Sequence, residues 1–290
     1  MDKIFYFHGN DTVDHWKPSY DLASFDESKG FMALADGVIR QKQEEVSIFP
    51  DQFASEAVSR TFVTKAGELA PEFDMDHGGM NELLHELNKE IANVNKQFGY
   101  DPNDKDAYWM GECVGGVVTV RENVLHYGIL EDCYVNVLRG DKLEDVVKMD
   151  HHIMKAKKFA DQLVESSPTL QFEDVWCKQL RNSPDAQDVN GDLIGWGSFN
   201  GQEDASLYWQ IGSVELIPGD VIILVSNGML PLFEHGNEFN PRIEEIMLKE
   251  DYQYGVSLQK ELSKLITDMI AEGYQNLHRE KTLLRTIWRG

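Results

Sequence analysis

The sequence predicts an α+β sandwich, in which two antiparallel β-sheets are flanked by helices. Two observations lead to this class. Most of the apolar, β-branched runs come in pairs joined by short turns, and strands joined in this way pair antiparallel. The helical segments are grouped between blocks of strands, which is typical of helices packed outside antiparallel sheets. No internal repeat or low-complexity linker interrupts the chain, so we expect one domain over residues 1–290.

The first 100 residues predict three strands followed by two helices. The strands are apolar or aromatic runs separated by polar, turn-forming residues, and they span 3–9, 21–25 and 30–38. The helices have apolar residues at helical spacing, and they span 49–70 and 79–98. One side of the first helix is predicted to carry Phe53, Ala57, Phe62 and Ala66.

The rest of the chain predicts more hairpins, three further helical segments and a final strand. The hairpins are β-branched runs joined by short turns, at 113–130 and 132–146, and residues 206–228 give two more strands on either side of a Pro-Gly step. The helical segments are 151–182, 240–250 and 256–276, and residues 281–288 form the last strand. The Arg139-Gly140-Asp141 tripeptide is interpreted as a hairpin turn rather than an integrin-binding signal. Residues 183–205 are rich in Gly, Asn and Asp and are predicted to be irregular.

The chain is strongly acidic, with 50 Asp and Glu residues against 27 Lys and Arg and a formal net charge of −23. Such a surface repels nucleic acid and anionic membranes, so we expect neither as a partner. The composition, 42% hydrophobic and 10% aromatic, is that of a globular protein. The charge leaves two interpretations open: a solvated acidic surface, or a concentration of carboxylates that binds divalent cations.

Neither the cysteines nor the first residues indicate an extracellular or membrane protein. Cys113, Cys133 and Cys177 form no CxxC pair and are odd in number, which argues against a disulfide framework and a structural zinc site. The first residues lack the basic and apolar regions of a signal peptide, and no apolar run is long enough to span a bilayer. We therefore expect a cytoplasmic protein, while its oligomeric state stays open.

Oxygen-bearing side chains stand at the ends or starts of several predicted strands. Asp36 follows FMALA, Asn227 follows IILVS, Glu280 precedes the last strand, and Asp21 begins the first hairpin. Mg²⁺ and Mn²⁺ prefer oxygen ligands, and side chains at neighbouring strand ends can converge on an ion. Taken alone, Asp36-Gly37 could equally be a plain turn, because an acidic chain places many Asp residues near turns.

A series of short motifs resembles, in order, the motifs of the metal-dependent protein phosphatases, the type 2C or PPM-type Ser/Thr phosphatase family. FMALADGV resembles the family's apolar strand that ends in Asp-Gly, with Asp21 at the family's spacing before it. GECVGGVVTV resembles the entry to a central strand, and LHYGILEDCYVNVLRGDKLEDVVKMDHH resembles a Gly-Asp-Ser hairpin that closes on Asp-His. VELIPGDVIILVSNGM resembles the strand that ends in Ser-Asp-Gly, and REKTLLRTIW resembles the last strand.

This resemblance covers nearly the whole chain and implies a fold and an activity. The fold would be a four-layer α/β/β/α sandwich, and the activity would be hydrolysis of phosphoserine and phosphothreonine in proteins. Two Mg²⁺ or Mn²⁺ ions would hold a bridging water and lower its pKa, and the resulting hydroxide would attack phosphorus in line. The implied partners are a phosphoprotein substrate or a cognate kinase.

The resemblance also assigns roles to individual residues. Asp36 would be a catalytic residue that bridges both ions, and the Gly37 carbonyl would bind one of them. Asp21 would be a metal-site and catalytic residue that orients metal-bound waters. Glu280 and Asn227 would complete the ligand shell of the first ion.

The motifs depart from the family's pattern at several of these positions. The metal-binding Asp of Ser-Asp-Gly is Asn227, whose amide oxygen adds no charge, and the last metal-binding Asp is Glu280, which is one methylene longer. Glu131 and Cys133 replace the Gly and Ser of Gly-Asp-Ser. Three alternatives follow: an enzyme that binds two ions or one weakly, a pseudophosphatase that acts as a binding or regulatory module, and an acidic protein whose charge is its function.

Other candidate residues carry weaker signals. Lys17 or Arg40 could replace the family's phosphate-binding Arg. The histidines at 151–152 could bind metal, but a polar loop that closes a hairpin is the simpler interpretation. Cys113 lacks the neighbouring basic residue that a cysteine phosphatase needs. GWGSFNG, residues 195–201, is either a loop that shapes substrate access or a packed surface loop.

Overall fold

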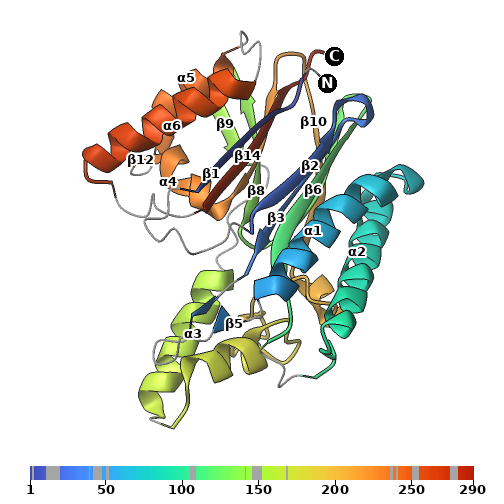
Figure 1. The fold of residues 1–290 in the computed structure, drawn as a ribbon, viewed down its shortest axis with the longest axis vertical. Helices are drawn as coiled ribbons and strands as arrows, with labels where there is room; N and C mark the ends of the chain where they lie inside the picture. The colour runs from blue at the N-terminus through green and yellow to red at the C-terminus, as the bar shows by residue number, and fades with distance from the viewer. Residues whose placement is uncertain are drawn as a thin grey trace.

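The computed structural model has two layers of β-sheet between two layers of helix, with a smaller lobe at one end (Figure 1). This confirms the predicted four-layer α/β/β/α sandwich. The structure describes residues 1, 3–10, 20–38, 40–41, 48–49, 52–104, 109–140, 142–145, 152–167, 169–235, 238–239, 241–249, 255–274 and 280–290.

The first sheet has the strand order β1-β14-β11-β8-β9, and its neighbouring strands are all antiparallel. Its strands are β1 (Phe5–Asn10), β14 (Glu280–Ile287), β11 (Val221–Ser226), β8 (Cys133–Arg139) and β9 (Lys142–Asp145). All six residues of β11 are buried, as expected for a central strand covered on both faces. The β8–β9 connection is a hairpin, as predicted, and Gly140 at its turn has φ +62°.

The second sheet has the strand order β10-β7-β6-β3-β2, again with antiparallel neighbours. Its strands are β10 (Trp209–Glu215), β7 (Val124–Leu130), β6 (Cys113–Arg121), β3 (Phe31–Gly37) and β2 (Leu22–Asp26). The first eight residues of β6 are buried, so this strand faces packed atoms on both sides. An apolar core fills the space between the two sheets, with Met32, Leu34, Val118, Ile129, Val135, Ile222, Leu224 and Leu284 among its members.

Two pairs of helices close the outer faces of the sandwich (Figure 1). Helices α1 (Gln52–Leu69) and α2 (His77–Gln97) cover the second sheet, and α5 (Pro241–Leu248) and α6 (Gly255–Ala271) cover the first. The Asp76 carboxylate caps α2 by accepting a 2.8 Å hydrogen bond from the Gly79 amide. No helix within the described ranges combines the length and apolarity needed to cross a bilayer.

Several short elements connect these layers. The short strands are β4 (Arg40–Gln41), β5 (Ile48–Phe49), β12 (Glu234–His235) and β13 (Glu238–Phe239). One-turn helices are α4 (Leu230–Phe233) and the 3₁₀ segments Glu27–Lys29, Ala70–Glu72 and Asn227–Met229. A longer 3₁₀ segment, Glu203–Tyr208, leads into β10.

Helix α1 buries Phe62 and Ala66 as predicted, but not Phe53. The buried residues are Ala54, Val58, Phe62 and Ala66, whereas Phe53 is 64% exposed. Phe53 precedes Phe62 by nine residues, which at about 100° per residue puts the two side chains on opposite sides of the helix.

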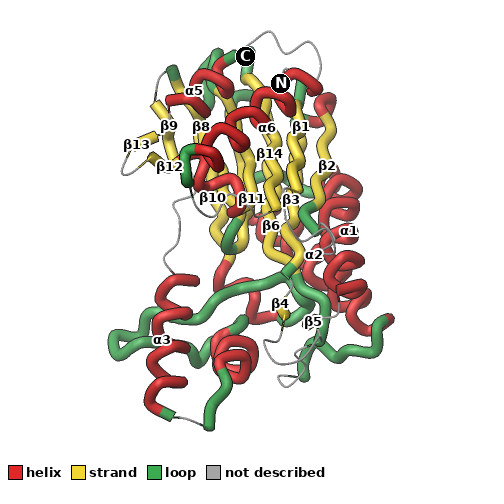
Figure 2. The backbone as a smooth tube through the Cα atoms, turned by 60° about the vertical axis from the view of Figure 1, so that its left-hand side comes forward, coloured by secondary structure: helices red, strands yellow, loops and turns green. Residues whose placement is uncertain are grey.

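A lobe formed by residues 152–203 extends from one end of the sandwich (Figure 2). It contains α3 (His152–Ser166) and a π-helix (Asp174–Leu180), followed by an irregular segment. The predicted helix over 151–182 is therefore interrupted, because Ser167 precedes a proline, which disfavours helical geometry. The lobe has its own apolar core, in which the rings of Trp176 and Trp196 stack with centroids 5.1 Å apart.

Candidate active site

The strand ends nearest the lobe bring the predicted acidic residues to one edge of the sandwich. In the second sheet, Gly37 at the end of β3 pairs with Cys113 at the start of β6. In the first sheet, Ser226 at the end of β11 pairs with Cys133 at the start of β8. The two sheets meet here, because Ser226 Oγ donates a 2.7 Å hydrogen bond to Asp21 Oδ2. The structure therefore places Asp21, Asp36 and Asn227 at the same edge of the sandwich.

Asp21 and Asp36 form the first half of this site. Leu22 pairs with Ala35, which sets Asp21 beside Asp36, and a hydrogen bond joins their carboxyl groups. Asp21 is 2% exposed, and burial raises its pKa, while hydrogen bonds from Ser226, Asp36 and Thr282 act in the opposite direction. Two carboxylates this close repel each other unless a proton or a cation lies between them.

Gly37 is fixed tightly behind Asp36. A Cβ atom at this position would lie 2.6 Å from Tyr20 Cβ and 2.9 Å from Ser59 Oγ, so only glycine fits without a shift of its neighbours. The Gly37 amide donates to the Tyr20 carbonyl at 3.3 Å, and the next amide, that of Val38, donates to the Glu112 carbonyl at 3.0 Å. The backbone that carries Asp36 is therefore held on both sides.

Asp132 and Asn227 form the second half, and sequence reasoning missed Asp132. Asn227 Nδ2 donates a 2.9 Å hydrogen bond to Asp132 Oδ2. The pairing of Ser226 with Cys133 makes this contact inevitable, because the preceding and following residues then lie side by side. The strand-end rule that identified Asp36 applies equally to Asp132, which directly precedes β8, and could have found it.

Glu280, the last predicted ligand, is described by the structure only in its backbone. Glu280 begins β14 opposite Asn10, so its backbone is at the correct edge, but its side chain lies outside the described residues. Two residues along the strand, Thr282 Oγ1 lies 3.0 Å from His8 Nδ1. Burial lowers the pKa of His8 and the nearby Asp21 charge opposes this, so His8 is a second site neighbour that the sequence did not reveal.

The overall structure is similar to solved structures of Ser/Thr phosphatases. Stp1 from Staphylococcus aureus matches with a TM-score of 0.61 and 13% identity, over 100% of this chain and 96% of that one. The catalytic domain of PstP, solved with two manganese ions, matches with a TM-score of 0.60 and 14% identity, over 98% and 97% of the two chains. The S. agalactiae Ser/Thr phosphatase matches with a TM-score of 0.59 and 16% identity, over 99% and 100%. No protein-family model matches the sequence, and no curated protein matches it either.

The chain has the fold of the PPM-type Ser/Thr phosphatases. At these levels of identity the likeness establishes the arrangement of strands and helices, while the chemistry of the site depends on the residues that this chain places there.

Within this phosphatase fold, the segment GWGSFNG is an interior segment rather than a surface loop. Trp196, Ser198, Phe199 and Asn200 are each at most 2% exposed. A Cβ at Gly195 would lie 2.2 Å from Tyr208 Oη, which explains the requirement for glycine there.

The cysteines are unsuited to act as nucleophiles in this fold. Cys113 and Cys133 are fully buried, and burial together with the neighbouring Asp36 charge raises the pKa of both thiols well above the usual range. The nucleophilic form is the thiolate, so a raised pKa argues against attack by either sulfur. The side chains of Lys17, Arg40 and the histidines at 151–152 lie outside the described residues.

The donor chemistry of the phosphatase-fold site fits a hard divalent cation. A cation between Asp21 and Asp36 would offset the repulsion of the two carboxylates, and their oxygen atoms are the ligand type that Mg²⁺ and Mn²⁺ prefer. Among the described side chains, no three His, Cys, Asp or Glu residues gather closely enough to hold an ion at one point. An ion bound here would therefore keep several waters, as Mg²⁺ commonly does when only one or two carboxylates hold it.

Proposed function

We propose that this protein hydrolyses phosphoserine or phosphothreonine in phosphoproteins with Mg²⁺ or Mn²⁺ as cofactor. The observation that carries the proposal is the pair of adjacent carboxyl groups at the edge of a PPM-type fold, the buried Asp21 and the half-buried Asp36, between which a cation could bind. The PstP structure with two manganese ions supports the choice of cofactor. The partner would be a phosphoprotein or the kinase that phosphorylates it.

When bound, the cations would supply Lewis-acid activation of a water and shield the charge that develops on the phosphoryl oxygens. The residues of this chain would hold them. Asp36, which is half-buried, would reach the solvent-facing side with one carboxylate oxygen, and Asp21 would orient waters from behind it. The Gly37 carbonyl, Asn227 and Glu280 would contribute further oxygen ligands.

A second candidate function has its own supporting observation. The amide of Asn227 already donates to Asp132, so this half of the site is satisfied without a cation. A pseudophosphatase that binds a partner through the same fold would have no need of metal at this position. It would show no metal-dependent rise in melting temperature, and Asp36→Ala would leave partner binding unchanged.

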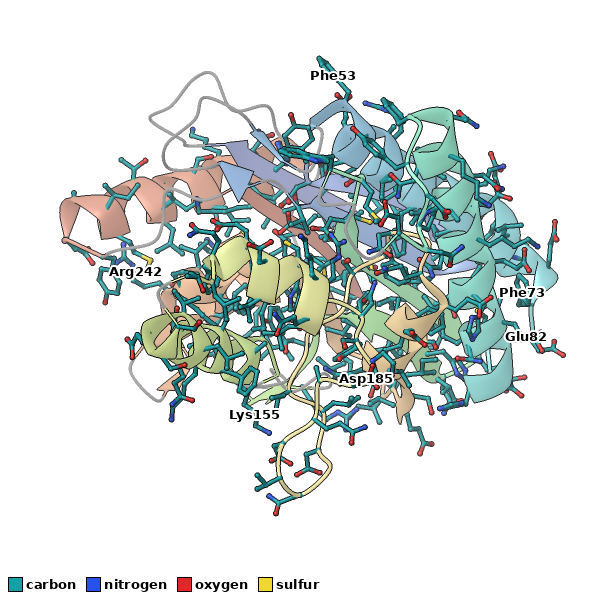
Figure 3. The ribbon with its side chains drawn as sticks, turned by 90° about the horizontal axis from the view of Figure 1, so that it is seen from below. Phe53, Phe73, Glu82, Lys155, Asp185 and Arg242 are labelled. Carbon is teal, nitrogen blue, oxygen red and sulfur yellow. The ribbon has the colours of Figure 1, made fainter. Side chains whose placement is uncertain are left out.

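The test is hydrolysis of a phosphothreonine peptide with Mn²⁺ titrated into the millimolar range and Mg²⁺ in parallel. Wild type is compared with Asp36→Asn and with Asp185→Asn, which removes one exposed carboxylate on the lobe (Figure 3). Asp36→Asn should lower turnover by about 10²- to 10³-fold, the range found when one electrostatic group at a reacting centre is lost. Asp185→Asn should match wild type. A folded wild-type protein with no turnover at any metal concentration would contradict the proposal and favour the binding module.

A further inference from the structure

A polar pocket of about 160 Å³ lies where the lobe meets the turn that follows α2. Three segments line it: residues 102–103 after α2, residues within 177–183 at the end of the π-helix, and residues 202–204 before β10. None of these is a candidate ligand of the acidic edge, so the pocket is separate from the site described above. A cavity of about 150 Å³ can hold a molecule of about six non-hydrogen atoms, so this pocket has room for a small metabolite.

The end of the π-helix forms one wall of the pocket. The Arg181 amide donates to the carbonyl of Trp176, five residues back, at 3.2 Å, which is the bond pattern of a π-turn. Such turns are rare and are frequent at functional sites. The Arg181 guanidinium is fixed from the sandwich side, because its Nη1 atom donates to Glu112 Oε2 at 3.2 Å and both side chains are at most 1% exposed. This wall is therefore held in place without a ligand.

A network of side-chain amides orients Gln202 in the pocket. Gln202 Oε1 accepts hydrogen bonds from Asn182 Nδ2 at 3.1 Å and from Asn200 Nδ2 at 2.9 Å. Those two amides are themselves oriented, since Asn182 Oδ1 accepts from the Ser198 amide and Asn200 Oδ1 accepts from the Gln202 backbone amide. Within the described part of the chain, Gln202 Nε2 donates to no protein acceptor. The pocket therefore contains a pre-oriented donor for an acceptor group of a ligand.

Charged side chains of both signs also line the pocket. Lys178 is 30% exposed, and its Nζ atom lies 3.1 Å from Asp174 Oδ1, which balances part of its charge. Glu203 and Asp204 are exposed and form no ion pair with any residue that the structure describes. Their carboxylates would stabilise an ammonium group, while Lys178 and the Gln202 amide would stabilise a carboxylate.

We propose that this pocket binds a small zwitterion, a free α-amino acid, with its ammonium group at Glu203 and Asp204 and its carboxylate at Gln202 and Lys178. A simple anion would be repelled by the two carboxylates. A simple cation would leave the oriented Gln202 donors without an acceptor. The inference goes beyond the phosphatase proposal and does not depend on it, because it concerns binding at residues outside the acidic edge.

The experiment titrates L-alanine into the wild-type protein by calorimetry, with propionate and ethylammonium as matched probes. Propionate lacks the ammonium group of alanine, and ethylammonium lacks its carboxylate. We expect L-alanine to bind with a dissociation constant of about 1 mM or tighter, as is reasonable for a ligand of this size. Each singly charged probe should bind at least about tenfold more weakly, since it loses one set of charge-assisted hydrogen bonds.

Variants and hydrogen exchange locate the binding. Glu203→Gln with Asp204→Asn, and separately Lys178→Met, should each weaken L-alanine binding about tenfold. These side chains are exposed or partly exposed, so their loss should leave the fold intact. Glu82→Gln is the matched control, because Glu82 is exposed on α2 and lies outside the pocket (Figure 3). In wild type, L-alanine should also slow the exchange of amides within 177–183.

Every outcome decides for or against the inference. No binding of L-alanine to folded wild type would overturn it, and so would equal affinity for propionate or ethylammonium, which would indicate a site for a simple ion. Equal L-alanine affinity in all the variants, or unchanged exchange over 177–183, would place the binding elsewhere and also overturn it. Since no phosphoester is used, a failure here leaves the phosphatase proposal untouched, and a failure of that proposal leaves this result valid.

Discussion

The edge of the sandwich that carries Asp21, Asp36, Asp132 and Asn227 has two halves, and the negative charge of the carboxylates is balanced differently in each. Asp21 and Asp36 are two carboxyl groups joined by a hydrogen bond, whereas Asp132 is joined to the neutral amide of Asn227 at 2.9 Å. The first pair needs a proton or a cation between its oxygens, while the second is already satisfied by an N–H donor. Asn227 therefore has an effect beyond its lack of charge as a ligand. Its amide N–H already stabilises the Asp132 carboxylate, which would otherwise need a cation.

The largest expected effect comes from making the two halves alike. Asn227→Asp would place a second carboxylate at hydrogen-bond distance from Asp132, and the pair would then require a proton or a cation. We expect Mn²⁺ affinity to rise about tenfold, equivalent to about 1.4 kcal/mol, and the metal-free protein to lose stability. Calorimetric Mn²⁺ titration and thermal melting in chelator measure the two effects.

The matched control for this variant is Asn93→Asp, which adds the same charge at an exposed position of α2. It should leave both quantities unchanged. Equal Mn²⁺ affinity in wild type and Asn227→Asp would show that the Asp132 half takes no part in cation binding.

A smaller effect tests the Asp21 half. Because burial raises the pKa of Asp21, the folded protein binds a proton more readily than the unfolded chain, and this stability is lost as pH rises through the raised pKa. Metal-free wild type should therefore lose free energy of unfolding between a mildly acidic pH and neutral pH. Asp21→Asn cannot titrate, so its slope over this window should be smaller. Urea unfolding at both pH values gives the comparison, and equal slopes would contradict it.

The smallest effect concerns the donor that supports Asp21. Ser226→Ala removes the 2.7 Å bond to Asp21 and the acceptor of the Thr282 amide at 3.0 Å. We expect a loss of about 1–3 kcal/mol of unfolding free energy at neutral pH, and a further rise in the pKa of Asp21. Ser206→Ala, which removes a bond from Ser206 Oγ to the Glu203 carbonyl, is the control. A Ser226→Ala protein as stable as the control would show that this bond contributes little.

Much of the fold could be predicted from the sequence, because its signals are local. Turn residues between β-branched runs predict hairpins, and these hairpins are present in both sheets. The predicted face of α1 was correct for Phe62 and Ala66 and wrong for Phe53, which the helical period places on the opposite side from Phe62. The break after α3 could have been predicted from the Ser167-Pro168 step.

The residues of the site could be predicted from the sequence only where they lie at the ends or starts of strands. Asp21, Asp36 and Asn227 came from that rule and meet at one edge, whereas Asp132 obeyed the same rule and was overlooked. The buried hydrogen bonds of Glu112 with Ser198 and of Glu131 with Gly197 could not be predicted, because the partners lie more than sixty residues apart along the chain. Long-range polar contacts of this kind leave no periodic signal in the sequence.

The central claim is that the edge carrying Asp21 and Asp36 binds divalent cations, and direct Mn²⁺ binding tests it without any substrate. Calorimetric or electron paramagnetic titration would compare wild type with Asp36→Asn, using Asp185→Asn as the control. We predict saturable binding to wild type and the control, and affinity at least about tenfold weaker in Asp36→Asn. Equal binding to all three folded proteins, or none to wild type, would contradict the claim.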